Sequence, residues 1–271
     1  MFRALTFLFV LACTSAFSHL ITDDNKLAEP LVAILETLEI PSDSSLTTVA
    51  EKLREKCHQS GDRWTFEHRF DHQRETLMPL LEDLGCFATV RASKKHYNYA
   101  VILGALRPAV QKRIDFLVEE WKRGIRFDEV VLLTGKRALR PSENCPNLQS
   151  ETEMMTLVWN ETPMPAELKS VRLTIVNSPP APGRDRATTE STVFAWLEMD
   201  PTPGHTLVVS SQPYVGYQES ILKARLPISF SIETIGPEGG QNLPTSVLMD
   251  NLSKWLIWTL KPCPASCKSN L

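Results

Sequence analysis

Two glutamates and a set of basic, hydroxyl and glycine residues are the parts of this sequence that could do chemistry. Glu153 and Glu190 each lie at the predicted start of a helix that follows a strand, where a carboxylate can act as a general acid or base. The candidate ligand-binding residues follow the same strands: Gly104, Arg113, Gly135, Arg184, Arg186, Thr188, Ser211 and Tyr214. Arginine holds carboxylates and phosphates through paired hydrogen bonds, and helix amino ends favour anions. The set predicts a site for a small anionic molecule, while each glutamate could equally serve only its own helix.

Several catalytic and cofactor motifs are absent from the chain. It has no GxSxG elbow and no Walker lysine loop, and the residues after Gly104 do not complete a GxGxxG fingerprint. The cysteines form no CxxC pair, so no zinc site is expected. His68 and His72 are four residues apart in a predicted helix, with Glu75 nearby. This could be a metal pair, but we favour a solvated charged face and expect no metal.

Short apolar runs alternate with amphipathic segments from residue 97 onward. Strands are predicted over residues 99–103, 129–134, 171–176, 206–210 and 229–235. The intervening segments and the last one, over residues 246–260, have the period of helices. This alternation predicts an α/β fold with a Rossmann-like, mainly parallel five-stranded sheet and flanking helices. Ligands bind such sheets at the carboxyl ends of the strands, so the candidate residues should share that edge.

The beginning of the chain predicts export. Residues 1–18 have a basic start, a short apolar stretch and a small-x-small cleavage pattern, as secretory signals do. A lipid anchor on Cys13 is the alternative. No later stretch is long enough to span a membrane. We therefore expect a periplasmic or secreted protein.

The organisation after the signal is predicted as three parts. Residues 19–92 form a helical N-terminal region, residues 93–262 the α/β domain, and residues 263–271 a tail. Helices are expected over 26–38, from Ser44 or Ser45 to Cys57, and over 65–84. Cys263 and Cys267 in the tail could form a disulfide or remain two thiols. The net charge of −3 and pI near 6.1 argue against nucleic acid as a partner.

The order of the sequence motifs over residues 97–260 resembles that of the YdcF-like domain group, which includes the envelope-associated SanA and ElyC proteins. That group has an LG-ended strand, a helix arginine, a second glycine-ended strand, a helix-opening acid, a T-x-E-N helix start and a late VTS-x-x-H-x-x-R segment. The counterparts here are Val101–Gly104, Arg113, Leu133–Gly135, Glu153, Thr188–Ser191 and Val209–Tyr214. Ser191 replaces the Asn, Tyr214 the His and Tyr217 the Arg. A ligand held by that His and Arg would be held differently here.

The resemblance implies an envelope setting and a nucleotide-like or S-adenosylmethionine-type ligand, and it supplies no reaction. The leading expectation is an exported cell-envelope protein that binds a small anionic or nucleotide-like molecule. One alternative is a transferase or hydrolase acting on an envelope sugar or lipid phosphate. Another is a non-enzymatic protein that docks an envelope partner through its helical region. The last requires an exposed apolar face on Leu27, Leu31 and Leu35.

Overall fold

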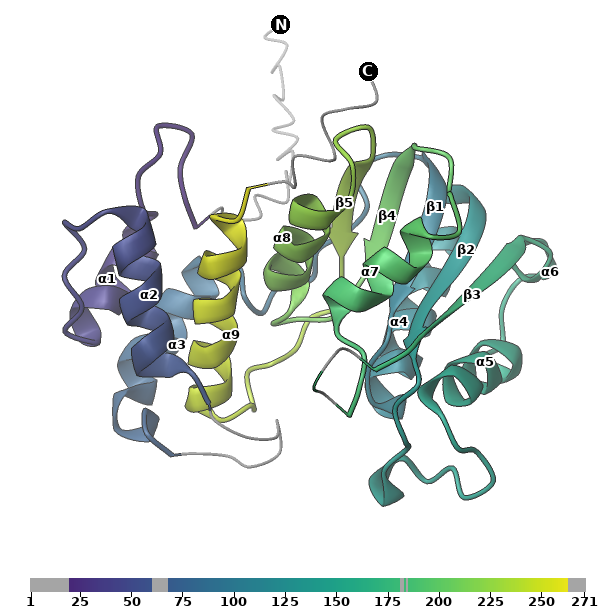
Figure 1. Ribbon diagram of the computed structural model, residues 1–271, viewed down its shortest axis with the longest axis horizontal. Coiled ribbons are helices and arrows are strands. Elements are labelled where there is room, and N and C mark those ends of the chain that lie inside the picture. The colour runs from purple at the N-terminus through teal and green to yellow at the C-terminus, as the bar shows by residue number, and fades with distance from the viewer. Residues whose placement is uncertain (1–19, 60–67, 181–182, 184, 263–271) are drawn as a thin grey trace, which may run out of the picture.

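A five-stranded parallel sheet forms the centre of the protein (Figure 1). Its strands are β1 (His96–Leu103), β2 (Arg126–Gly135), β3 (Arg172–Ser178), β4 (His205–Val209) and β5 (Ser231–Ile235). Their order is β3-β2-β1-β4-β5, and every neighbouring pair is parallel. The predicted α/β fold is confirmed. The order reverses at β1: β2 and β3 follow on one side of it, and β4 and β5 on the other.

The computed structural model describes residues 20–59, 68–180, 183 and 185–262. The predicted signal peptide, the tail cysteines and Arg184 lie outside this part of the chain. Among the described residues, no helix is long and apolar enough to cross a membrane.

Helices cover both faces of the sheet because the central strands are apolar on both sides. On one face, α4 (Arg107–Lys122) and α5 (Glu151–Glu161) bury a cluster that includes Ile102, Ile114 and Met154. On the other face, α7 (Thr189–Leu197) and α8 (Val215–Arg225) cover Val101 and Val131. The short α6 (Ala166–Lys169) leads into β3.

A separate apolar core lies beside the sheet, on the left of Figure 1. It is formed by α1 (Glu29–Thr37), α2 (Leu46–Cys57), α3 (Arg74–Asp83) and the last helix, α9 (Thr245–Thr259). Leu31 and Leu35 are fully buried in it, together with Leu252 and Trp255 of α9. The predicted helical region therefore forms, and it is completed by a helix from the other end of the chain. Because α9 also packs on α8, it joins this core to the sheet.

The structure corrects the prediction of one long helix over residues 65–84. A 3-10 turn covers Asp71–Gln73, and the α-helix begins only at Arg74. His68 precedes both elements, and its Nδ1 lies 2.6 Å from an Asp71 carboxylate oxygen. His68 and His72 therefore do not share a helical face, and the described residues contain no group of three potential metal ligands.

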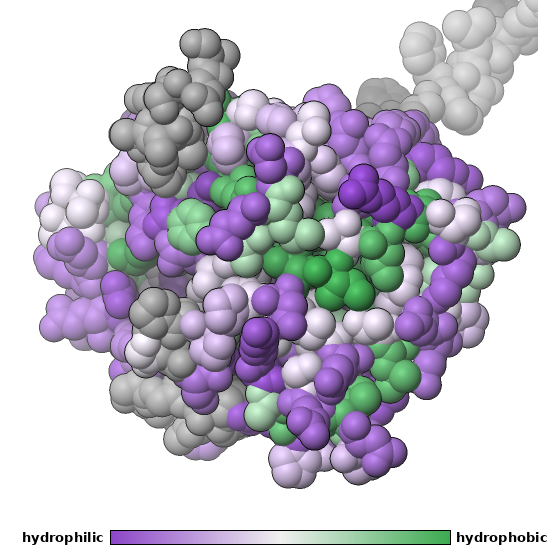
Figure 2. Space-filling model, turned by 45° about the vertical axis from the view of Figure 1, so that its right-hand side comes forward, coloured by the Kyte–Doolittle hydropathy of each residue, from purple (hydrophilic) through white to green (hydrophobic). Residues whose placement is uncertain are grey.

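Most large apolar side chains are buried, and the exceptions are scattered over several elements. In the part of the chain that the structure describes, the exposed ones are Leu106, Ile175, Phe194, Met199 and Ile228. Figure 2 shows apolar surface interrupted by polar residues on the face it presents.

Candidate functional site

The point where the strand order reverses places the loops after β1 and β4 side by side at the carboxyl edge of the sheet. Neighbouring loops diverge at such a point and leave a crevice where α/β proteins bind ligands. The helices that follow these strands also direct their amino ends toward this edge, which favours negative charge there.

Arg113 is a buried cation that joins the ends of β1 and β4. It lies in α4, and only 2% of its surface is exposed. Its Nη1 donates to the carbonyl oxygens of Leu103 and Gly104 at 2.6 and 3.0 Å, and its Nη2 donates to Ser211 Oγ at 3.3 Å. Long helical side chains point back toward the helix amino end, so Arg113 reaches the strand end from within α4. Three residues predicted for the site, Gly104, Arg113 and Ser211, are thus brought together.

Glu151, the first residue of α5, supplies a buried carboxylate at the same edge. One carboxylate oxygen accepts the Gly135 N–H at 3.0 Å, and the other accepts from Arg137 Nε at 3.1 Å. Burial raises the pKa of Glu151 above its usual range, against the opposing effects of Arg137 and the Gly135 amide. A carboxyl group that retains its proton to higher pH can act as a general acid.

The two glycines predicted for the site permit close approach of other groups. A Cβ on Gly104 would lie 3.0 Å from the Glu151 carboxyl atoms. A Cβ on Gly135 would lie 2.6 Å from the Ala187 Cβ and 3.4 Å from a Glu151 oxygen. Glycine is therefore needed at these strand ends because a side chain would displace the carboxylate or the loop before α7.

A clamp between Arg137 and Glu143 holds the loop after β2. The Arg137 guanidinium donates two parallel hydrogen bonds, of 2.7 and 2.8 Å, to the Glu143 carboxylate. It also donates to the Ala105 carbonyl at 2.9 Å, which ties this loop to the one after β1. Although burial acts to raise it, the net pKa of Glu143 is lowered, because Arg137 and the amides of Arg140 and Arg107 stabilise the charged form. Arg137 thus orients Glu151 and positions both loops.

The predicted catalytic residues lie elsewhere and have other partners. Glu153 is exposed and accepts the backbone N–H groups of Gln149 and Ser150, so it completes the capping box of α5. Glu190 pairs with Arg225 at 2.5 Å on the side of α8. Neither carboxylate belongs to the group around Arg113.

The other predicted ligand-binding residues are also spread out. Thr188 caps α7 through the Ser191 amide at 3.1 Å. Tyr214 lines a small cavity of about 20 Å³ between α8 and α9. Arg186 is half-buried in the loop before α7. Of the predicted residues, Gly104 and Gly135 therefore lie against Glu151, and Arg113 and Ser211 are bonded to each other at the Gly104 end of β1.

The signal that could have identified Glu151 lies in the capping pattern itself. Ser150 and Glu153 form a capping box, in which the carboxylate at the third helical position accepts the backbone N–H of the capping residue. Glu151, at the first position, is not used by the box. Of the two glutamates, it is the one left to face the strand ends.

The chain was compared with family models, curated proteins and solved structures. No family model, curated protein or solved structure matches this chain. The resemblance to the YdcF-like group therefore stays a prediction.

Proposed function

We propose that this protein binds a small anionic, nucleotide-like molecule in the crevice between β1 and β4, in a cell-envelope or secreted setting. The observation that carries the proposal is the buried guanidinium of Arg113, held at the carboxyl edge of the sheet and bonded to Ser211 in the loop after β4. Desolvated arginine is favourable where an anion is recognised. The export component rests on the sequence of residues 1–18.

Ser211 is the residue best suited to contact the ligand directly. Its oxygen accepts a hydrogen bond from Arg113, so its own hydrogen can turn toward a bound oxyanion. Arg113, already bonded to two carbonyl oxygens, supplies fixed positive charge behind the hydroxyl. Charge placed in advance costs little reorganisation when the anion arrives.

The buried carboxyl of Glu151 favours a second candidate function, a transferase or hydrolase that acts on a phosphate-bearing sugar or lipid. Its pKa is raised by burial, and it lies against Gly104 at the crevice. In this role Glu151 would donate a proton to a leaving oxygen or accept one from a nucleophile.

The non-enzymatic alternative loses the feature on which it depended. Leu31 and Leu35 are fully buried in the helical core, and Leu27 is partly buried against it. The helical region therefore offers no apolar face along these residues to a partner.

Calorimetric titration with inorganic phosphate, AMP and S-adenosylmethionine tests the binding proposal. We expect at least one to bind, and Ser211→Ala to weaken it about tenfold, the value of a hydrogen bond to a charged group. Lys112→Gln is the matched control, because it removes a positive charge from the neighbouring exposed position of α4. Equal affinities in the wild type, Ser211→Ala and a folded Arg113→Met variant would contradict the proposal.

The catalytic candidate is tested by comparing substitutions at Glu151 and at Glu153, two residues away. Hydrolysis of a phosphomonoester probe should fall by about 100-fold or more in Glu151→Gln, as expected on loss of a general acid. It should be unchanged in Glu153→Gln, since glutamine also completes a capping box. Equal rates in the two variants would exclude Glu151 from the chemistry.

A further inference from the structure

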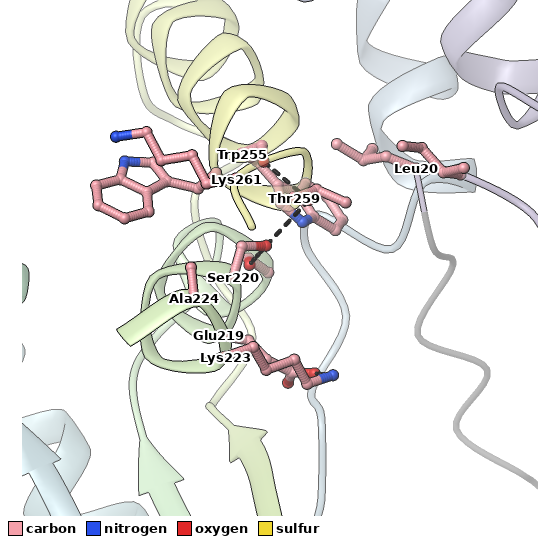
Figure 3. Close-up of a pocket in the computed structure, with 11 residues that line it drawn as sticks. Leu20, Glu219, Ser220, Lys223, Ala224, Trp255, Thr259 and Lys261 are labelled. Carbon is pink, nitrogen blue, oxygen red and sulfur yellow. Dashed lines mark hydrogen bonds and ion pairs between the residues drawn. The ribbon is translucent and has the colours of Figure 1, made fainter. Parts of the chain in front are cut away.

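A groove lies between α8 and α9, separate from the carboxyl edge of the sheet (Figure 3). Its volume is about 180 Å³. Ser220 of α8 and Thr259 of α9 lie on its two sides, and the buried side chains of Leu20, Ala224 and Trp255 form its floor.

The floor of the groove is apolar and firmly held. Leu20, Ala224 and Trp255 are buried members of the protein interior, so their positions are fixed by packing. The hydroxyl groups of Ser220 and Thr259 are 3.1 Å apart and bond across the groove, as Figure 3 shows. The groove thus offers rigid apolar surface with two hydroxyls at its centre.

The charge around the groove is positive at one end. Lys261 Nζ lies 3.7 Å from the centre of the Trp258 ring, and Arg225 Cζ lies 4.7 Å from it. Within the described residues, no carboxylate comes within ion-pair distance of Lys261, whereas Lys223 pairs with Glu219 and Arg225 with Glu190. Burial lowers the pKa of Lys261; Glu190 opposes this shift, and Arg225 and Arg54 add to it. A bound anion would stabilise the charged form of Lys261.

We propose that the groove binds a small amphiphilic monocarboxylate, with its apolar tail against Trp255 and Leu20 and its carboxylate at Lys261. The combination of an apolar floor and one cation without a carboxylate partner selects this class over neutral apolar molecules and over multivalent anions. The volume is below the roughly 300–1,000 Å³ of drug-sized sites, so the tail that fits is short. The site is independent of the crevice at Arg113.

Titration calorimetry on the whole chain tests the proposal, with octanoate and neutral 1-octanol as the probes. Octanoate should bind the wild type with saturation and more tightly than octanol. Lys261→Gln should weaken octanoate about threefold, as for a partly exposed ion pair, and leave octanol unchanged. Thr259→Phe, at an exposed position that lines the groove, should weaken both about tenfold through loss of tail burial.

Two controls make the outcomes decisive. Lys112→Gln removes a lysine on the other side of the sheet and should bind both probes as the wild type does. Ser220→Phe fills the groove from α8 and should repeat the effect of Thr259→Phe. Absence of octanoate binding, an equal loss of octanol in Lys261→Gln, or unchanged binding in a folded groove-filling variant would overturn the proposal.

Discussion

The carboxyl edge of the sheet and the groove between α8 and α9 are organised in opposite ways. At the edge, Arg137 is bonded to the buried carboxylates of Glu143 and Glu151, and Arg113 is bonded to two backbone carbonyls and to Ser211. At the groove there is open volume, an apolar floor and Lys261 with no carboxylate at ion-pair distance among the described residues. Dense polar contacts fix the geometry of the first region, whereas the second offers space and a less constrained charge.

Because one region is a bonded polar network and the other an open apolar groove, the two regions require different properties of a ligand. An anion at the edge joins an existing network, so its affinity depends on geometry set before it binds. A ligand in the groove gains mainly from apolar burial and one ionic contact. The edge should therefore be sensitive to single changes in its charged residues, and the groove to changes in volume.

The largest expected effect is at the arginine that holds the edge together. Arg137→Ala leaves Glu143 and Glu151 buried without their cation, so we expect a loss of about 3–5 kcal/mol in the free energy of unfolding. Urea unfolding measures it. Arg172→Ala is the control, because the Arg172 side chain is 76% exposed in its pair with Glu129 and should contribute at most about 1 kcal/mol. Equal effects would mean that the edge network is not a stabilising unit.

The next effect concerns the core beside the groove. Leu252→Ala removes a buried side chain of α9 from the cluster formed with α1–α3. The expected loss is about 2–5 kcal/mol, and unfolding should stay a single transition because α9 packs on both α2 and α8. Leu106→Ala, at an exposed position, should change stability by no more than about 0.5 kcal/mol. Two separate transitions in the wild type would contradict this link.

A smaller effect distinguishes a capping residue from one at the crevice. Ser150→Ala removes the hydrogen bond from the Glu153 amide to the Ser150 hydroxyl, and should cost about 1 kcal/mol. Glu153→Gln should lower the free energy of unfolding by only about 0.3 kcal/mol, since glutamine can accept the same backbone hydrogen bonds. Thermal denaturation measures both. A large loss in Glu153→Gln would show that its charge does more than cap α5.

The smallest effect is on how the free energy of unfolding changes with pH, and its sign is opposite for the two buried carboxylates. The pKa of Glu151 is raised above 4.5, so the folded state keeps its proton longer than the unfolded chain does. The stability of the wild type relative to Glu151→Gln should therefore fall as pH rises above 4.5 and through the folded pKa. The pKa of Glu143 is lowered, so the stability relative to Glu143→Gln should fall as pH drops below 4.5. Urea unfolding across pH measures both, and slopes of the same sign would contradict the assignment.

The sequence by itself determined the sheet and the starts of several helices. The apolar runs of β1 and β2 mark buried parallel strands, and Ser45, Ser150 and Thr188 each cap the helix that follows. These features depend on periodicity and on hydrogen bonds within a few residues, which is why they can be read locally. Gly104 and Gly135, as strand-end residues, were placed at the carboxyl edge for the same reason.

Only the tertiary structure decided which charged residues meet. Arg113 reaches Ser211 although 98 positions separate them, and Glu151, not Glu153, faces the crevice. The apolar face of α9 indicated burial, but its contact with helices from the beginning of the chain follows from the packing of the whole fold. An amphipathic pattern states that a face is buried and not what covers it, because the partner is fixed by contacts distant in the sequence.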